Sequence, residues 1–351
     1  MRAHTLPGDR LLAGPVLLDH RAVWVEAGHR LLVRSLDALG RTGTLFSTSE
    51  TPGAPKGVLW PFSVRSIAAD DGQVAFTEAV IPCASAPAAS ARCVPGGGEG
   101  HAADSVTLFA GPRGAIRPVE SLVPPRPNCQ GAPEPVAVAV ADAGLIVYEV
   151  SAYPARQCEV VSRLALRTFS GRLVRVLAEG LPIISQFIAA GEWVAVFKRA
   201  QEAGKQDEVQ ILSAKTGQVV QRLRSRILAF TLDRSGTFAL ITEPRRGRCE
   251  QGLPLATLSV GEIGRPDLRV LTKEALGDEP ASTALAVAEG QVVYAQPTGS
   301  CASGGQVVVA TPGAPSRAVP ALEIGSRLVF DGSVVATAHN DTVQLAALRR
   351  R

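Results

Sequence analysis

The chain of 351 residues has few aromatic side chains, few histidines and no long hydrophobic run. Aromatic residues make up 5% of it, too few for the stacking surfaces on which sugars or single-stranded nucleic acids commonly bind. No window approaches eighteen consecutive apolar residues, so we expect no transmembrane helix. The first ten residues are polar and contain Pro7-Gly8, and they do not resemble a signal peptide.

Charge of one sign is also lacking. The 36 basic and 32 acidic residues leave a formal net charge of +4, which is too balanced for a nucleic-acid-binding surface. The clusters Arg245–Arg248 and Arg349–Arg351 are short, and no aromatic residues interleave them. We therefore interpret both clusters as solvated surface and predict no nucleic-acid partner.

The motifs of common catalytic and metal sites are missing as well. The sequence contains no Gly-x-Ser-x-Gly elbow, no phosphate-binding glycine loop, no calcium loop and no Cys-x-x-Cys pair. The five histidines have no metal-ligand spacing and no serine and aspartate companions in catalytic order. The sequence thus predicts no catalytic residue, no metal site and no cofactor.

One pattern is present many times. The turn signal Asp71-Gly72, followed by the alternating run Gln73–Phe76, has counterparts along the whole chain. The spacings between the successive turn glycines are 72, 47, 45, 54 and 42 residues, for Gly72, Gly144, Gly191, Gly236, Gly290 and Gly332. A seventh turn is Asp19-His20, and the longest interval contains an Ala-, Ser-, Pro- and Gly-rich insertion, Pro82–Asp104. Each unit has room for four strands, and no unit shows helical periodicity.

Units of this period with four strands predict an all-β fold, a single seven-bladed β-propeller of antiparallel blades. The last unit has only three strands before the chain ends, so we expect Arg2–Leu6 to supply its fourth strand and close the ring. The predicted domain is one propeller spanning 1–351. Its expected blades are 11–50, 60–122, 134–180, 184–224, 226–272, 280–322, and 325–351 together with 2–6.

These units resemble WD40-like and TolB-type propeller repeats. The resemblance lies in the strand–turn–strand segments Leu232–Leu240 and Asp70–Phe76, and it covers the chain as architecture. No unit has a Trp-Asp dipeptide, and the Pro-Asp-Gly turn typical of the TolB type is absent. The resemblance implies a propeller used for binding or scaffolding, with a protein or peptide partner, and names no ligand.

The six cysteines all fall in segments that the blade pattern places on one face of the ring. Five follow the second strands of their blades and Cys129 precedes the third blade, which suggests the pairs Cys83–Cys93, Cys129–Cys158 and Cys249–Cys301. Three such pairs favour disulfides and an oxidising, extracytoplasmic compartment, whereas six free thiols would indicate a cytosolic protein.

Candidate binding residues lie at the ends of the second strands, on the same face as the cysteines. They are Glu26, Glu78, Glu149, Lys198, Glu243, Gln296 and His339. Carboxylates gathered there could bind a cation, a basic peptide or a sugar, although strand ends are also polar simply because water is near. Trp60 precedes the second blade on that face and either anchors a partner or fills the space between blades. Trp24 and Trp193 are expected in the core.

The main functional hypothesis is therefore a non-enzymatic binding or scaffolding propeller that is monomeric and lies outside the cytoplasm. The alternatives are a propeller hydrolase or lyase acting on a sugar or lactone, and a cytosolic protein-interaction platform. We expect any working surface on the cysteine-bearing face, away from the Asp71-Gly72 turn.

The cysteine pattern makes the first testable prediction. A peptide map of the unreduced protein should show the pairs Cys83–Cys93, Cys129–Cys158 and Cys249–Cys301, each closing a loop that restricts the unfolded chain by about 2–4 kcal/mol. Reduction should lower the midpoint of thermal unfolding. Six thiols that all react with iodoacetamide in the unreduced protein would contradict both the pairing and the oxidising compartment.

Overall fold

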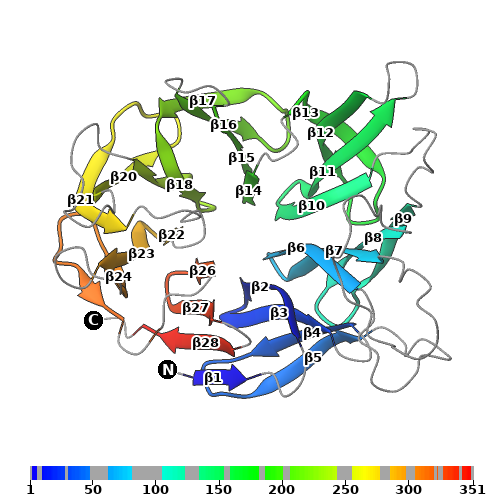
Figure 1. Ribbon diagram of the computed structural model, residues 1–351, viewed down its shortest axis with the longest axis horizontal. Coiled ribbons are helices and arrows are strands. Elements are labelled where there is room, and N and C mark those ends of the chain that lie inside the picture. Colours follow the sequence, from blue (N-terminus) through cyan, green and yellow to red (C-terminus); the bar gives the residue numbers. More distant parts are fainter. Residues whose placement is uncertain are drawn as a thin grey trace, which may run out of the picture.

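Seven β-sheets surround a central axis in the computed structural model of this protein (Figure 1). The structure describes residues 2–5, 10–27, 31–47, 62–80, 105–122, 134–153, 159–181, 186–200, 206–242, 255–276, 285–297, 305–319, 322, 327–339 and 342–348. These residues form 28 strands, β1–β28, and the described part of the chain contains no helix. No helix in that part is therefore long and apolar enough to cross a membrane.

Each sheet is a blade of four antiparallel strands in chain order. The first three blades are β2 (Arg10–Leu18), β3 (Arg21–Ala27), β4 (Leu31–Leu36) and β5 (Thr42–Ser47); β6 (Phe62–Asp70), β7 (Gln73–Val80), β8 (Ser105–Pro112) and β9 (Arg117–Leu122); and β10 (Glu134–Ala141), β11 (Gly144–Tyr153), β12 (Glu159–Arg167) and β13 (Leu173–Glu179). The next three are β14 (Gln186–Ala190), β15 (Trp193–Lys198), β16 (Asp207–Ser213) and β17 (Val219–Ser225); β18 (Ile227–Leu232), β19 (Thr237–Thr242), β20 (Leu255–Glu262) and β21 (Arg269–Leu276); and β22 (Leu285–Ala288), β23 (Gln291–Pro297), β24 (Gly305–Ala310) and β25 (Arg317–Ala318).

The seventh blade joins the two ends of the chain. Its strands are β26 (Arg327–Phe330), β27 (Val334–His339), β28 (Thr342–Ala347) and β1 (Arg2–Thr5). Strand β1 pairs with β28 in antiparallel register, with Arg2 opposite Leu345 and Thr5 opposite Thr342. Both the propeller and its closure by an N-terminal strand are thus confirmed.

The turn between the first and second strand of each blade is here called the inner turn, and in blades one, two and six both of its central residues have positive φ. Asp71 and Gly72 have φ values of 47° and 73°, and Glu289 and Gly290 have values of 49° and 71°. Positive φ at both central residues is the type I′ geometry, whose twist matches that of the flanking strands. The recurring acidic-Gly pairs are therefore explained by the hairpin geometry itself.

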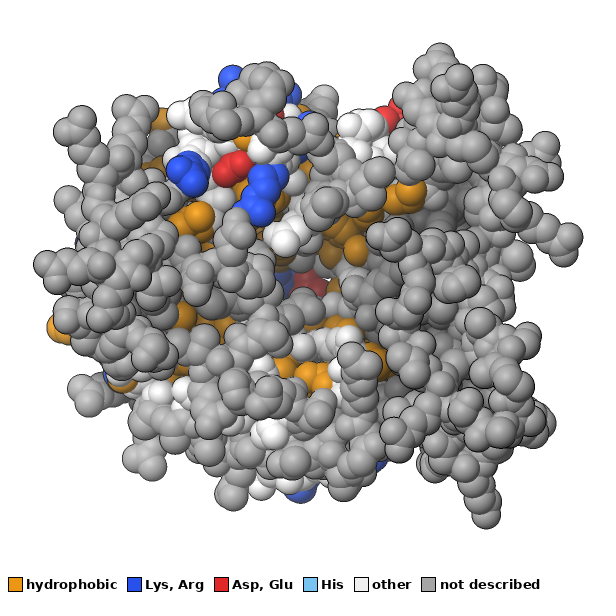
Figure 2. Space-filling model, in the orientation of Figure 1, with side chains coloured by type: hydrophobic (Ala, Val, Ile, Leu, Met, Phe, Trp, Pro, Cys, Tyr) orange, Lys and Arg blue, Asp and Glu red, His pale blue; other side chains and the backbone are white. Residues whose placement is uncertain are grey.

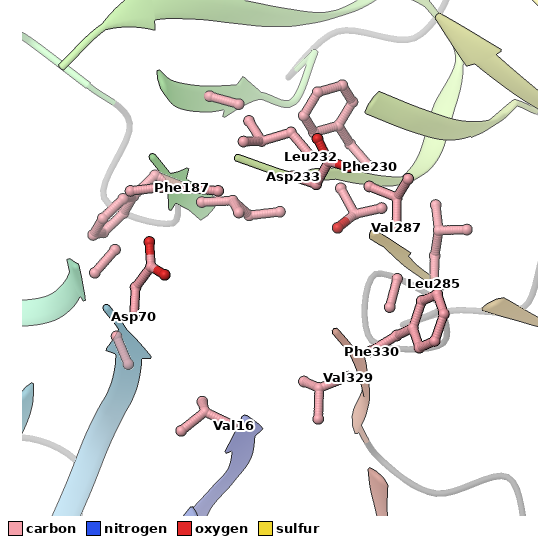
Figure 3. A pocket seen from close by; sticks show the side chains of 18 of the residues that line it. Val16, Asp70, Phe187, Phe230, Leu232, Asp233, Leu285, Val287, Val329 and Phe330 are labelled. Atoms are coloured by element: carbon pink, nitrogen blue, oxygen red, sulfur yellow. The ribbon is translucent and has the colours of Figure 1, made fainter. Parts of the chain in front are cut away.

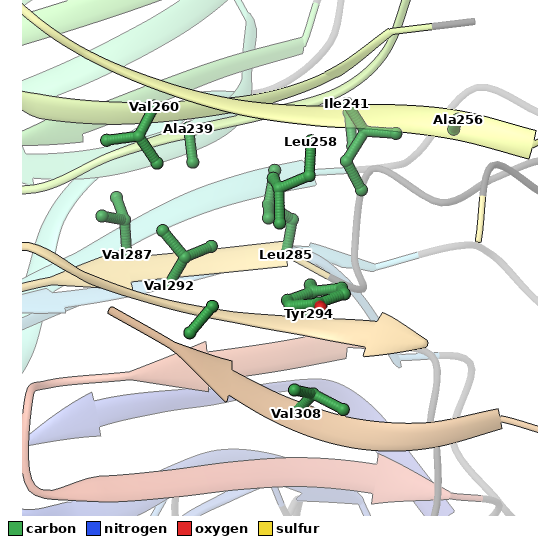
Figure 4. Packing of buried hydrophobic residues seen from close by; sticks show 12 residues of the cluster. Ala239, Ile241, Ala256, Leu258, Val260, Leu285, Val287, Val292, Tyr294 and Val308 are labelled. Carbon is green, nitrogen blue, oxygen red and sulfur yellow. The ribbon is translucent and has the colours of Figure 1, made fainter. Parts of the chain in front are cut away.

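The core lies between the blades. Alternate residues of each strand point to opposite faces of its sheet, and both faces are covered by neighbouring blades. Figure 4 shows one such layer, in which Leu258 of blade five packs with Val292 and Tyr294 of blade six. Trp24 is fully buried as predicted, whereas Trp193, at the start of β15, is only partly buried. All six cysteines lie outside the described residues, so their pairing stays a prediction.

Deleting residues 1–6 tests the ring closure. The deletion removes the four-residue pairing with β28 and leaves that strand as an open edge. We expect the free energy of unfolding to fall by roughly 2–4 kcal/mol, at about 1 kcal/mol for each backbone hydrogen bond lost, with faster aggregation. Urea unfolding would measure the loss, and deletion of residues 349–351 is the control. Equal stability of the two deletion variants would contradict a closing role for β1.

Candidate functional site

A central channel of about 890 Å³ follows the axis of the ring. Its wall consists of the innermost strand of every blade, β2, β6, β10, β14, β18, β22 and β26, together with a few residues beside them. In Figure 3, Val16, Phe187, Val287 and Val329 surround the open space, and the carboxylate of Asp70 points into it. The channel volume lies within the range of small-molecule and peptide-segment sites.

Most of the channel wall is apolar. Each inner strand contributes alanine, valine, leucine, isoleucine or phenylalanine side chains, such as Ala68, Val138 and Ile188. The charged residues that line it lie at or beside the inner turns, so they gather at one end of the channel. They are Asp70, Asp233, Arg234, Glu289 and Asp331. In Figure 2, acidic and basic side chains are visible deep in the centre of the ring.

A second cavity of about 300 Å³ lies at this charged end. Its residues come from the inner turns of blades one, two, five and seven, including Asp19, His20 and Gly72. Four residues line both the channel and this cavity: Leu17, Asp70, Arg234 and Asp331. We call this end the turn mouth. The four shared residues therefore lie where the two cavities adjoin.

Arg234 connects blades that are distant in the chain. From the inner turn of blade five, its Nη2 lies 2.6 Å from Oδ1 of Asp142 in blade three. Its Nη1 lies 3.2 Å from Oδ1 of Asp70, at the end of β6 in blade two, and 3.8 Å from Oδ1 of Asp71. One guanidinium therefore contacts carboxylates of two other blades, using the fork of donors that a lysine lacks.

Asp70 is the least exposed of the three carboxylates, with a side chain 19% exposed against 77% for Asp71 and 49% for Asp142. Burial raises the pKa of Asp70, while the charge of Arg234 and the backbone N–H of Gly191 act in the opposite direction. That N–H lies 3.4 Å from Oδ2 of Asp70. The carboxylate thus meets groups from blades four and five.

Asp233 fixes the turn that carries Arg234. Its Oδ1 accepts hydrogen bonds from the N–H groups of Ser235 and Thr237, at 2.9 and 3.0 Å, and from the Ser235 hydroxyl at 2.6 Å. Aspartate that caps its own turn in this way is a common means of rigidifying a loop. The Arg234 side chain therefore begins from a defined backbone position.

A second polar contact at the turn mouth joins the first and last blades. Nδ1 of His20 lies 2.7 Å from Oδ2 of Asp331 and 2.9 Å from the Ser333 hydroxyl. Both partners meet the same ring nitrogen, whereas a catalytic triad places serine and aspartate on opposite nitrogens. This group therefore connects the two blades and does not have the geometry of an activated serine.

Two of the predicted binding residues, Glu26 and Glu149, lie in separate blades. Glu26 and Glu149 are each 1% exposed and are held by arginines of the neighbouring strand in their own blades. Arg34 Nε lies 2.8 Å from Glu26, and the Nε atoms of Arg163 and Arg167 lie 2.7 and 2.6 Å from Glu149. Neither carboxylate lines the channel.

The other predicted residues have different surroundings. Glu78 on β7 is 6% exposed, and burial raises its pKa to about 6. Lys198 and Gln296 are partly buried at the ends of β15 and β23 and do not line the channel. His339 ends β27, and Glu243 and Trp60 lie outside the described residues. Their role in binding stays a prediction.

In the sequence, hairpin geometry accounts for the acidic residues of the inner turns. That account gives no sign that they meet Arg234 at one end of the channel. Inner strands run to the same end of a propeller, so the seven inner turns necessarily surround one opening. Arg234 is the only arginine or lysine at the centre of any of these turns. That exception to a repeated pattern is the signal from which the Arg234 contact could have been suspected.

Comparisons with known proteins identify the fold and no family. No family model matches the chain, and no curated protein matches its sequence. Among solved structures, the chain is similar to a puromycin-hydrolysing peptidase of Mycobacterium tuberculosis, with 13% identity and a TM-score of 0.55. That match covers 93% of this chain and 50% of the peptidase. An acylaminoacyl peptidase of Pyrococcus horikoshii matches with 9% identity and a TM-score of 0.58, covering 97% of this chain and 52% of that one.

A third match is to a propeller alone. The β-propeller domain of the Trilobed protease from Pyrococcus furiosus has 8% identity and a TM-score of 0.55, and the match covers 98% of this chain and 99% of that one. The chain thus equals an isolated peptidase propeller in extent and spans about half the length of the peptidases that it matches. At these identities the likeness establishes the fold alone.

These matches correct the main functional hypothesis. A non-enzymatic binding or scaffolding module was expected, whereas the matched propellers belong to hydrolytic enzymes. The hydrolase alternative is better supported, although none of these three proteins is described as acting on a sugar or a lactone.

Glu78 provides a test of the burial assigned to it. Its pKa in the folded state, about 6, lies above the ordinary value of 4.5, so the fold favours the protonated carboxyl. The associated stabilisation is present below pH 4.5 and is lost as the pH rises through 6. Glu78→Gln should therefore exceed the wild type in free energy of unfolding by about 2 kcal/mol at pH 8, and the gain should disappear at pH 4.

Urea unfolding at several pH values would measure the difference. Glu192→Gln, at an exposed glutamate of the β14–β15 turn, removes the same charge without altering a buried site. A Glu78→Gln gain that is independent of pH would show that the carboxyl is not held in an apolar environment.

Proposed function

We propose that this chain is the propeller part of a peptidase-type hydrolase and that its central channel takes an extended segment of a peptide. The observation that carries the proposal is the apolar channel of about 890 Å³ in a fold whose solved counterparts are peptidase propellers. An extended peptide has an apolar side chain at many positions and a backbone that can lie along the axis. The wall offers surfaces suited to both.

The chemistry of the wall supports a peptide over a highly polar ligand. Aliphatic side chains such as Ile188 and Leu228 contact apolar groups favourably and leave sugar hydroxyls without partners. Polar groups are concentrated at the turn mouth, where Asp70, Glu289, Asp331 and Arg234 are close to the axis. A ligand with an apolar body and a charged end fits this distribution.

In this proposal the groups that cleave the substrate are not those of the described residues. The His20, Asp331 and Ser333 group has the wrong geometry for an activated serine, and the described residues contain no cluster suited to a metal ion. The propeller's contribution is selection by size and apolar character, and cleavage belongs to a catalytic unit associated with it. The six cysteines favour an extracytoplasmic location for the propeller and its associated catalytic unit.

Binding of a defined peptide by the chain tests the proposal. The probe is Ala-Ala-Phe-Ala-Ala with a fluorescein at its C-terminus, and fluorescence anisotropy would report its dissociation constant. Leu228→Asp places a charge in the apolar wall, so we expect at least about tenfold weaker binding, or roughly 1.4 kcal/mol. Thr231→Trp places a large side chain in the channel beside the same wall and should weaken peptide binding to the same extent.

The matched control is Leu39→Asp, the same chemical change at a side chain that is 66% exposed and remote from the channel. Thermal unfolding would verify that each variant is folded. If the wild type bound maltohexaose and ignored the peptide, the substrate would be a sugar. If the channel variants bound the peptide as the wild type does, the channel would not be its site.

A further inference from the structure

We propose that Arg234 is the gate of the turn mouth: its guanidinium, held by Asp70 and Asp142 of two other blades, narrows this end of the channel. The inference is independent of which ligand the channel takes. It rests on the ion pairs that join three blades and on the two cavities that meet at these residues.

The first step of the argument is position. Arg234 and Asp70 line both the channel of about 890 Å³ and the outer cavity of about 300 Å³. A residue that contacts both spaces lies on the boundary between them. Leu17 and Asp331 share this property, so the boundary is formed by residues of blades one, two, five and seven.

The second step is reach. Arg234 starts from blade five and contacts blade two, and these two blades have two others between them on one side of the ring and three on the other. Arg234 thus extends beyond its own blade to blades two and three, and the N–H of Gly191 in blade four meets the same Asp70 carboxylate. No ion pair joins Arg234 to Asp233 of its own turn: Oδ1 of Asp233 accepts from Ser235 and Thr237, and Oδ2 is buried without a hydrogen-bond partner among the described residues.

The third step is that the bridge is able to open. The side chains of Arg234 and Asp142 are 48% and 49% exposed, so water screens their interaction and replaces it readily. The backbone that carries Arg234 is fixed by its turn, which means that opening requires only rotation of one long side chain. The gate is therefore one side chain that rotates on a fixed backbone. When the gate is closed, a ligand enters the channel from the opposite face.

The experiment measures access to the channel directly. Ala69→Cys places a thiol on β6 that lines the channel and not the outer cavity. The probe is N-ethylmaleimide, a neutral reagent, and mass spectrometry of the peptide carrying position 69 gives the rate of modification at that site alone. Entry from the opposite face sets the wild-type rate, and opening the turn mouth next to position 69 adds a second route, so loss of these partly exposed ion pairs should raise the rate about fivefold.

Two variants in the Ala69→Cys background separate gating from electrostatics. Arg234→Gln removes a positive charge and Asp142→Asn removes a negative one, so their effects on thiol reactivity through charge are opposite in sign. A gate requires both to raise the rate, with the double variant no faster than the faster single one. Arg234→Lys, which keeps the charge and loses the fork, should give an intermediate rate.

Arg265→Gln is the matched control, because it breaks an exposed pair with Glu262, 2.8 Å long, on the turn between β20 and β21. It should leave the rate unchanged, and thermal unfolding would confirm that all variants are folded. Rates that move in opposite directions, or remain at the wild-type value in both Arg234→Gln and Asp142→Asn, would overturn the gate. The outcome does not depend on peptide binding, so the two proposals fail separately.

Discussion

The pairing of β1 with β28 is the interaction on which the ring depends. A blade buries both of its faces only when a neighbour covers each of them, and the first and last blades are neighbours only in a closed ring. Where they meet, Trp24 and Leu36 of blade one pack with Val334, Val343 and Leu345 of blade seven. This apolar layer and the His20–Asp331 contact above it both require the two chain ends to be held together.

Closure also determines where a site can form. The inner strands cannot meet at the axis, so they leave a channel whose wall is made of residues that also pack between blades. Every inner turn lies at the same end of this channel and contains only two to four residues, as Asp71-Gly72 illustrates. The turn mouth is therefore formed by compact turns.

Much of the fold was predictable because local sequence signals for turns and strands recur along the chain. The acidic-Gly pair at Asp71 favours a type I′ turn, and alternation along Gln73–Phe76 favours a strand, and the chain adopts both. The site was not predictable in the same way. Glu149 was expected at a strand end but lies in the middle of β11, and the sequence could not show that Arg163 and Arg167 neutralise it. Convergence of Arg234 and Asp142, which are 92 residues apart, exists only after the ring has closed.

The wall and the turn mouth differ in how firmly they are held. Residues of the wall belong to the packed layers between blades, so a change in the wall disturbs the core and its cost is large. The Arg234 bridge consists of partly exposed ion pairs whose rupture costs little. Under the two proposals, selection by shape belongs to the tightly packed wall, and control of access belongs to these partly exposed ion pairs. A channel arranged in this way can alter which end is open without altering what it accepts.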